Sequence, residues 1–163
     1  MDRADEARTR AILDLQEGRG AIPLLDEAAA LDVLRRARRI AVVGASPTAG
    51  RPSHEVMRYL QAQGYICVPI NPLATEMLGQ PAYPDLAAAV AASGAPFDLV
   101  DVFRRPEHVP EIAREAVATG CGALWLQLGV VSWEGARIAH DGGLGVVMDR
   151  CTAIEHRKLR PRP

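Results

Sequence analysis

The fold is decided by the stretch Ile40-Ala41-Val42-Val43-Gly44-Ala45-Ser46, an apolar run that stops at a glycine. A loop of small residues follows it, and a helical pattern begins near Arg51-Pro52-Ser53. Strand, tight turn and helix in this order are typical of the start of a nucleotide-binding βαβ unit. Such a turn directs backbone N–H groups and the positive end of a helix dipole at one point, which suits a phosphate group.

Four further apolar runs follow along the chain, at residues 65–70, 98–103, 123–128 and 144–148. Each run is continuous rather than alternating, as expected for strands that are buried on both faces. Helical patterns separate the runs, at residues 53–63, 85–92, 106–119 and 132–140, and another precedes the first strand at 26–38. The pattern predicts an α/β fold: a Rossmann-like, doubly wound, mostly parallel five-stranded sheet with helices on both faces.

Length and composition indicate one main domain. The chain has 163 residues, 48% of them apolar, and a formal net charge of −1, so its charge indicates neither a nucleic-acid nor a membrane partner. No apolar run is long enough to span a membrane, and we expect a cytoplasmic protein. We divide the chain into a helical extension (residues 1–24), a Rossmann-like domain (25–158) and a basic tail (159–163). Its three cysteines are far apart, which disfavours disulfides and a zinc site.

The turn after the first strand lacks the second and third glycines of a G-x-G-x-x-G dinucleotide fingerprint, because Ser46 and Ala49 stand at those positions after Gly44. The helix starts late, at Pro52, and proline suits a first helical turn. Ser46 or Ser53 can cap free amides or bind a phosphate oxygen, and Arg51 adds a cation there. The alternative interpretation is an ordinary connection between a strand and a helix.

The second strand ends in Asn71-Pro72, where NAD-binding domains usually place an acidic residue for the ribose hydroxyls. A neutral asparagine does not repel a phosphorylated ribose. This argues against NAD and leaves NADP or another ligand with a phosphorylated ribose open, although Asn71-Pro72 is also a common turn sequence.

The ends of the third and fourth strands supply further candidates. Phe103-Arg104-Arg105 precedes a helix that starts with proline, and two adjacent arginines there can clamp an anion. Gln127-Leu128-Gly129-Val130 ends the fourth strand, and Gly129 allows close approach of a ligand to the backbone. Solvated surface arginines and a structural turn are the alternatives.

The chain resembles the small stand-alone CoA-binding proteins, which are similar to the CoA-binding domain of the succinyl-CoA synthetase alpha subunit. The resemblance covers about residues 28–158 and leaves residues 1–24 outside. It is carried by motifs that occur in order: Gly44-Ala45-Ser46, Arg51-Pro52-Ser53, Gly64-Tyr65, Pro69-Ile70-Asn71-Pro72, Phe103-Arg104-Arg105-Pro106, Trp125-Leu126-Gln127-Leu128-Gly129-Val130 and Asp149-Arg150-Cys151.

The resemblance implies a Rossmann-like domain that binds coenzyme A or an acyl-CoA. It implies that Gly44-Ala45-Ser46 and the Pro52 helix hold the pyrophosphate, and that Asn71 and Pro72 lie near the adenosine. Phe103 and Arg104 would border the nucleotide, and Gln127, Gly129 and Val130 the pantetheine. We do not expect a counterpart of the second, phosphohistidine-bearing domain of the synthetase subunit, and its chemistry is not carried over.

The sequence predicts binding without catalysis, because arginine, asparagine, glutamine and backbone amides hold anions but supply no base or nucleophile. His54 and His108 fall in first helical turns near the site, as possible neutral donors to a phosphate or as exposed residues. Cys151 follows the fifth strand, either as a thiol that meets the CoA thiol or as a structural residue. The alternatives are an NADP-dependent reductase and the CoA-binding subunit of a split acyl-CoA synthetase; the sequence does not identify a protein partner.

Overall fold

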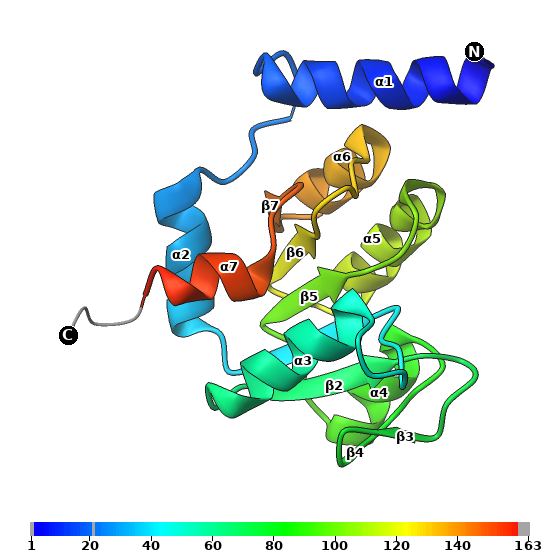
Figure 1. Cartoon of the computed structure of the whole chain (residues 1–163), viewed down its shortest axis with the longest axis vertical. Helices are drawn as coiled ribbons and strands as arrows, with labels where there is room; N and C mark the ends of the chain where they lie inside the picture. Colours follow the sequence, from blue (N-terminus) through cyan, green and yellow to red (C-terminus); the bar gives the residue numbers. More distant parts are fainter. Residues whose placement is uncertain (1, 21, 160–163) are drawn as a thin grey trace.

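The computed structural model of the protein describes residues 2–20 and 22–159. Five strands form one parallel sheet in the order β2-β1-β5-β6-β7. Figure 1 labels β2, β5, β6 and β7 of this sheet. They are β1 (Arg39–Val43), β2 (Ile66–Ile70), β5 (Leu99–Val102), β6 (Ala123–Leu126) and β7 (Gly145–Val147). The chain leaves β1 first toward β2 and later crosses to β5 on the other side, so the strand order reverses between β1 and β5. The predicted doubly wound sheet is confirmed.

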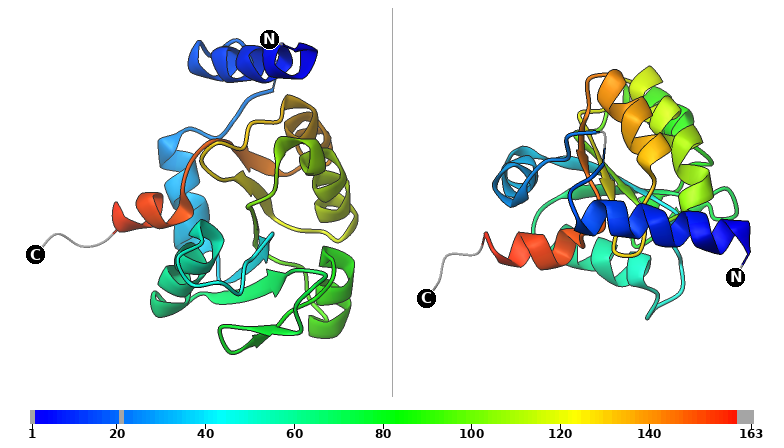
Figure 2. Two further views of the ribbon diagram at one scale, coloured as in Figure 1. Left: turned by 45° about the vertical axis from the view of Figure 1, so that its right-hand side comes forward. Right: turned by 90° about the horizontal axis from the view of Figure 1, so that it is seen from above.

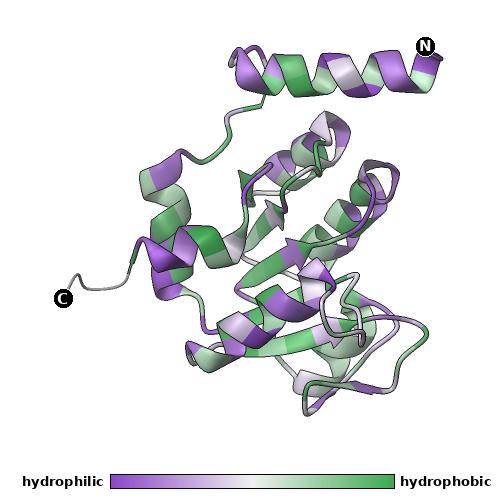
Figure 3. Ribbon diagram, in the orientation of Figure 1, coloured by the Kyte–Doolittle hydropathy of each residue, from purple (hydrophilic) through white to green (hydrophobic). Residues whose placement is uncertain are grey.

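Helices cover both faces because successive strand residues point to opposite sides. Ala41 and Val43 belong to a core cluster with α4 (Leu86–Ser93), α5 (Val109–Ala118) and α6 (Trp133–Asp141). Ile40 and Val42 belong to a second cluster with α2 (Glu27–Arg36) and α3 (Pro52–Ala62). α7 (Thr152–Arg157) packs against α2 and α3. Figure 2 shows the sheet between these two layers, and Figure 3 shows that its strands are mainly apolar.

Two features between the main elements differ from the predicted pattern. A short hairpin joins β3 (Glu76–Met77) to β4 (Gln80–Pro81) through Leu78 and Gly79, which both have positive φ, the geometry of a type I′ turn. The sequence analysis assigned no strands here, because two-residue strands leave no periodic pattern. The helix predicted from residue 106 begins as a 3₁₀ turn (Pro106–His108) and continues as α5.

α1 (Arg3–Gln16) lies within the helical extension predicted at residues 1–24 and outside the two helical layers, at the top of Figure 1. Ala11, Ile12 and Leu15 pack against the α4–α6 core cluster. The Trp133 indole Nε1 donates a hydrogen bond of 3.1 Å to the carbonyl oxygen of Ala11. Within the described part of the chain, no helix is both long and apolar enough to cross a bilayer. Residues 160–163 of the predicted tail lie outside the described residues.

Candidate functional site

A cleft of about 860 Å³ lies at the carboxyl ends of the strands, where the strand order reverses between β1 and β5. Open α/β sheets bind ligands at such switch points, and this volume suits a cofactor. All residues assigned to the ligand site from the sequence line this cleft except Pro72, which lines a smaller cavity beside it. The cleft is thus lined by Gly44, Ala45, Ser46, Arg51, Pro52, Ser53, Asn71, Phe103, Arg104, Arg105, Gln127, Gly129 and Val130, and also by Arg8, Pro47, Pro106 and Leu128, which the sequence analysis did not assign.

Gly44 follows β1 and joins the turn to the neighbouring strand. Its φ is +82°, a left-handed conformation that favours glycine. A Cβ at this position would lie 2.7 Å from the carbonyl oxygen of Phe103 and 2.9 Å from the Cδ of Arg104. The turn after β1 and the backbone after β5 therefore approach each other closely, which places both at the same wall of the cleft.

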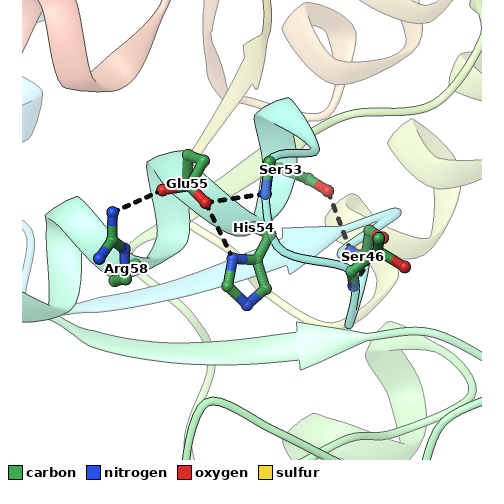
Figure 4. Close-up of polar contacts among 7 residues, drawn as sticks. Ser46, Ser53, His54, Glu55 and Arg58 are labelled. Carbon is green, nitrogen blue, oxygen red and sulfur yellow. Dashed lines mark hydrogen bonds and ion pairs between the residues drawn. The ribbon is translucent and has the colours of Figure 1, made fainter.

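The loop between β1 and α3 is held by polar side chains of the loop and of the first turn of α3, as Figure 4 shows. The Ser53 hydroxyl oxygen accepts a hydrogen bond of 2.9 Å from the backbone N–H of Ser46. Ser46 in turn accepts one of 3.1 Å from the N–H of Thr48, and Glu55 accepts one of 2.9 Å from the N–H of Gly50. Of the two serine roles expected from the sequence, the structure shows capping of loop amides.

Backbone donors remain at the start of α3. The N–H groups of Ser53 and His54 lie in its first turn, where a helix supplies no acceptors for its own donors. Pro52 is the first residue of the helix, and Arg51 precedes it without a side-chain capping bond. The positive end of the helix dipole and the Arg51 cation therefore meet at the wall of the cleft, an arrangement that binds anions.

Asn71 lines the cleft, but its side chain is bonded within the protein. Its Nδ2 donates a hydrogen bond of 2.9 Å to the carbonyl oxygen of Ala45, and its Oδ1 accepts one of 2.7 Å from the N–H of Leu73. Asn71 thereby ties the end of β2 to the turn after β1. Asn71 therefore contributes to the site in two ways. Its hydrogen bonds shape this turn, and its neutral side chain places no negative charge at the end of β2.

Replacing Asn71 with aspartate should weaken ligand binding and lower the stability by about 1–3 kcal/mol. An ionised carboxylate cannot donate to the Ala45 carbonyl, and it places a negative charge beside the anion site. Urea unfolding and calorimetry of Asn71→Asp at pH 7 measure the two effects. Parent-like affinity in this variant would show that Asn71 lies outside the functional site.

The charge of the cleft is positive. Four arginines line it, namely Arg8, Arg51, Arg104 and Arg105. No carboxylate of the described residues lines it. Across residues 2–20 and 22–159, none of these four forms an ion pair. Guanidinium groups without acidic partners are available for phosphate groups, which they bind in bidentate geometry.

A buried polar network lies behind the cleft. Gln127 Nε2 donates to Asp101 Oδ1 at 2.6 Å and to the Thr152 hydroxyl oxygen at 2.9 Å, and that hydroxyl donates to Asp101 Oδ2 at 2.9 Å. Asp101 is fully buried, and burial raises the pKa of its carboxyl to about 7 although both hydrogen bonds lower it. The Gln127 amide that the sequence assigned to the ligand is thus fixed from behind. The sequence carries one signal for this network, because Asp101 is a charged residue in the middle of the apolar run 98–103.

The pKa of Asp101 predicts a distinctive pH dependence. The unfolded chain loses this proton near the ordinary value of 3.8, whereas the folded chain keeps it until about pH 7. Between these two pH values the folded state binds more protons than the unfolded state. The protonated Asp101 therefore stabilises the folded protein fully below about pH 4, and this stabilisation is lost as the pH rises through about 7. Asp101→Asn has no group that titrates at this position and serves as the reference. Relative to it, the parent should lose up to about 1.4 kcal/mol of stability per pH unit between pH 4 and 7. Urea unfolding of both proteins at several pH values measures this difference, and parallel profiles would contradict it.

The end of β6 is joined to the end of β7. The N–H of Gly129 donates a hydrogen bond of 2.7 Å to Asp149 Oδ1. The N-cap of α7 is Cys151, two residues after Asp149. Since its N–H is bonded to the protein, Gly129 offers a ligand close approach rather than a donor.

The histidine and cysteine candidates lie outside the cleft lining. His54 Nδ1 lies 3.4 Å from Glu55 Oε1, and His108 lines the smaller cavity beside the cleft together with Pro72. Cys151 lines a different cavity together with Leu15 and Leu128, while Cys67 and Cys121 are buried. Among the described residues, no cluster of histidine, cysteine or acidic side chains is arranged to hold a metal ion.

Residues 38–157 match the family described as CoA binding domain. The protein YneT of Bacillus subtilis (strain 168) is 37% identical over 125 residues, which cover 77% of this chain and 90% of YneT.

Solved structures are similar as well. A hypothetical protein from Pyrococcus horikoshii OT3 has a TM-score of 0.76 and 33% identity, covering 83% of this chain and 92% of its own. The dinucleotide forming acetyl-coenzyme A synthetase 1 of Ca. Korarchaeum cryptofilum has a TM-score of 0.58 and 25% identity, with 71% of this chain matching 27% of that chain.

Proposed function

Since this chain belongs to the CoA binding domain family, we propose that its cleft binds coenzyme A or an acyl-CoA without catalysing a reaction of it. The observation that carries this proposal is that four arginines line one cleft together with the first turn of α3, and that none of them forms an ion pair within the described residues. CoA carries a diphosphate and a ribose phosphate, and a cleft with this charge is complementary to them.

The ligand is oriented by the elements that border the cleft. The diphosphate lies at the turn after β1 and the start of α3, where backbone donors and Arg51 converge. The adenosine lies toward Asn71 at the end of β2, with Pro72 behind it. The pantetheine follows Gln127, Gly129 and Val130 at the end of β6. Phe103 and the arginines 104 and 105 border the nucleotide from the end of β5.

Binding without catalysis is supported by the chemistry of the lining. Within the described chain, no histidine, cysteine or carboxylate lines the cleft. The Ser53 hydroxyl oxygen accepts a backbone hydrogen bond, and among residues 2–20 and 22–159 it has no histidine partner of the kind that activates a serine. The isolated chain is therefore expected to hold the thioester without hydrolysing it.

A second candidate function is supported by one comparison. The synthetase from Ca. Korarchaeum cryptofilum matches this chain over about a quarter of its length. This chain is then the CoA-binding subunit of a split acyl-CoA synthetase, and the catalytic steps need a second chain.

Thermal unfolding with added nucleotides tests the proposal. We expect CoA and acetyl-CoA to stabilise the protein more than NAD, NADP or ATP do. A ligand at one hundred times its dissociation constant adds about 2.7 kcal/mol of stability, which is readily measured. An equal or larger effect of NAD or NADP would contradict the proposal. Steady release of free CoA from acetyl-CoA by the isolated chain would contradict binding without catalysis.

A further inference from the structure

One arginine of the cleft comes from outside the family match. Arg8 belongs to α1, whereas the match to the CoA binding domain family begins at residue 38. Arg8 nevertheless lines the same cleft as the arginines that follow β1 and β5. The N-terminal helix therefore adds a cation to a site that the family domain otherwise builds alone.

α1 is held in the position that brings Arg8 to the cleft. Arg8, Ala11, Ile12 and Leu15 follow the spacing of one helix face, and the last three pack against the core. Ala11 also accepts the hydrogen bond from the Trp133 indole. The linker that follows α1 packs closely against the same indole at Gly20. A Cβ on Gly20 would lie 1.9 Å from the Trp133 ring, so there is no room for a side chain at this position.

The electrostatic surroundings of Arg8 differ from those of Arg19 in the linker. Arg19 pairs with Asp14 and Glu17. Arg8 has no ion-pair partner within the described ranges, and it adds to the positive charge of the cleft. Like charges that converge on one cleft repel one another, and an anion among them removes this cost.

Arg8 approaches the cleft from the β6 side. Leu15, two turns further along α1, lines a neighbouring cavity together with Leu128, and Leu128 lines the main cleft as Arg8 does. Arg51 instead lies at the start of α3, next to the turn after β1. Cations on two sides of the cleft are suited to a ligand with more than one anionic group.

We propose that Arg8 binds an anionic group of the ligand, a phosphate or a carboxylate, and that α1 is thereby part of the binding site. This inference rests on the proposed function, since it takes CoA or an acyl-CoA as the ligand. Because coupling is reciprocal, a ligand that contacts Arg8 also strengthens the packing of α1 against Trp133.

Calorimetric titration of Arg8→Gln with CoA tests this proposal. The matched control is Arg10→Gln, because Arg10 belongs to the same helix but lines a groove away from the cleft. We expect Arg8→Gln to weaken CoA binding about tenfold, as for loss of one charge-assisted hydrogen bond, and Arg10→Gln to bind like the parent. Titrations with 3′-dephospho-CoA and succinyl-CoA identify the group that Arg8 binds.

Each pattern of results has one meaning. A tenfold loss for CoA but not for 3′-dephospho-CoA assigns Arg8 to the ribose phosphate, and an equal loss for both assigns it to the diphosphate. A loss for succinyl-CoA alone assigns Arg8 to a carboxylate on the acyl group. Parent-like binding of all three ligands by Arg8→Gln overturns the role of Arg8, and so does an equal loss in Arg10→Gln. If the parent itself binds none of them, the proposed function fails and Arg8 fails with it.

Discussion

Replacing Gly44 with alanine should destabilise the protein by about 2–3 kcal/mol and abolish measurable CoA binding. The φ of +82° is unfavourable for alanine, and the new Cβ would lie 2.7 Å from the carbonyl oxygen of Phe103. That oxygen belongs to the backbone, so the strands must move apart at the switch point. Because the turn after β1 and the arginines after β5 meet there, the same movement separates the groups proposed to bind the ligand. Urea unfolding and calorimetry measure the two losses.

Gly50 provides the control in the same loop. Its φ is +89°, but a Cβ there has no neighbour within 4 Å. Gly50→Ala therefore introduces only the backbone strain, about 1–2 kcal/mol, without the collision. If Gly44→Ala and Gly50→Ala have the same stability and the same affinity, the contact between Gly44 and Phe103 does not shape the site.

Replacing Arg104 with alanine should weaken CoA binding by about 1.5–3 kcal/mol, the range for a hydrogen bond to a charged group. Arg104 follows β5, lines the cleft and has no ion-pair partner in the described chain. Its Cδ lies 2.9 Å from the position of a Gly44 Cβ, which places its side chain against the phosphate turn. Calorimetric titration with CoA at low salt measures the loss.

Salt and a surface arginine serve as controls for this prediction. The loss in Arg104→Ala should shrink as the salt concentration rises, because ions screen a partly exposed pair. Arg114→Ala changes a largely exposed arginine on α5 whose nearest carboxylate oxygen, on Glu134, is 3.9 Å away, and it should bind CoA like the parent. Undiminished binding by Arg104→Ala at low salt would shift the anion site to Arg51 or Arg105.

The sequence predicted the fold well because its signals are local. The apolar runs become the five parallel strands, since a strand buried on both faces must be continuously apolar. The start of α3 at Pro52 was likewise visible, because proline fixes the first turn. The hairpin of β3 and β4 was missed, since its two-residue strands are specified by the turn at Leu78 and Gly79 rather than by a pattern.

The site was predictable in part. The sheet topology brings the ends of β1, β2, β5 and β6 together, so residues at those ends were found without knowledge of their contacts. The contacts themselves depend on tertiary structure. The bonds of Asn71 to the Ala45 carbonyl and of Gln127 to Asp101 join separate strands. Arg8 was missed because nothing in the spacing of α1 shows where that helix packs.

A crystal structure of the protein with CoA tests the central claim most directly. The account predicts the diphosphate oxygens within hydrogen-bond distance, about 2.7–3.2 Å, of the backbone nitrogens of Ser53 or His54 at the start of α3. It also predicts at least one of Arg51, Arg104 and Arg105 in contact with a phosphate, and the pantetheine along residues 127–130. CoA bound elsewhere, or a diphosphate remote from α3 and all three arginines, would contradict the account.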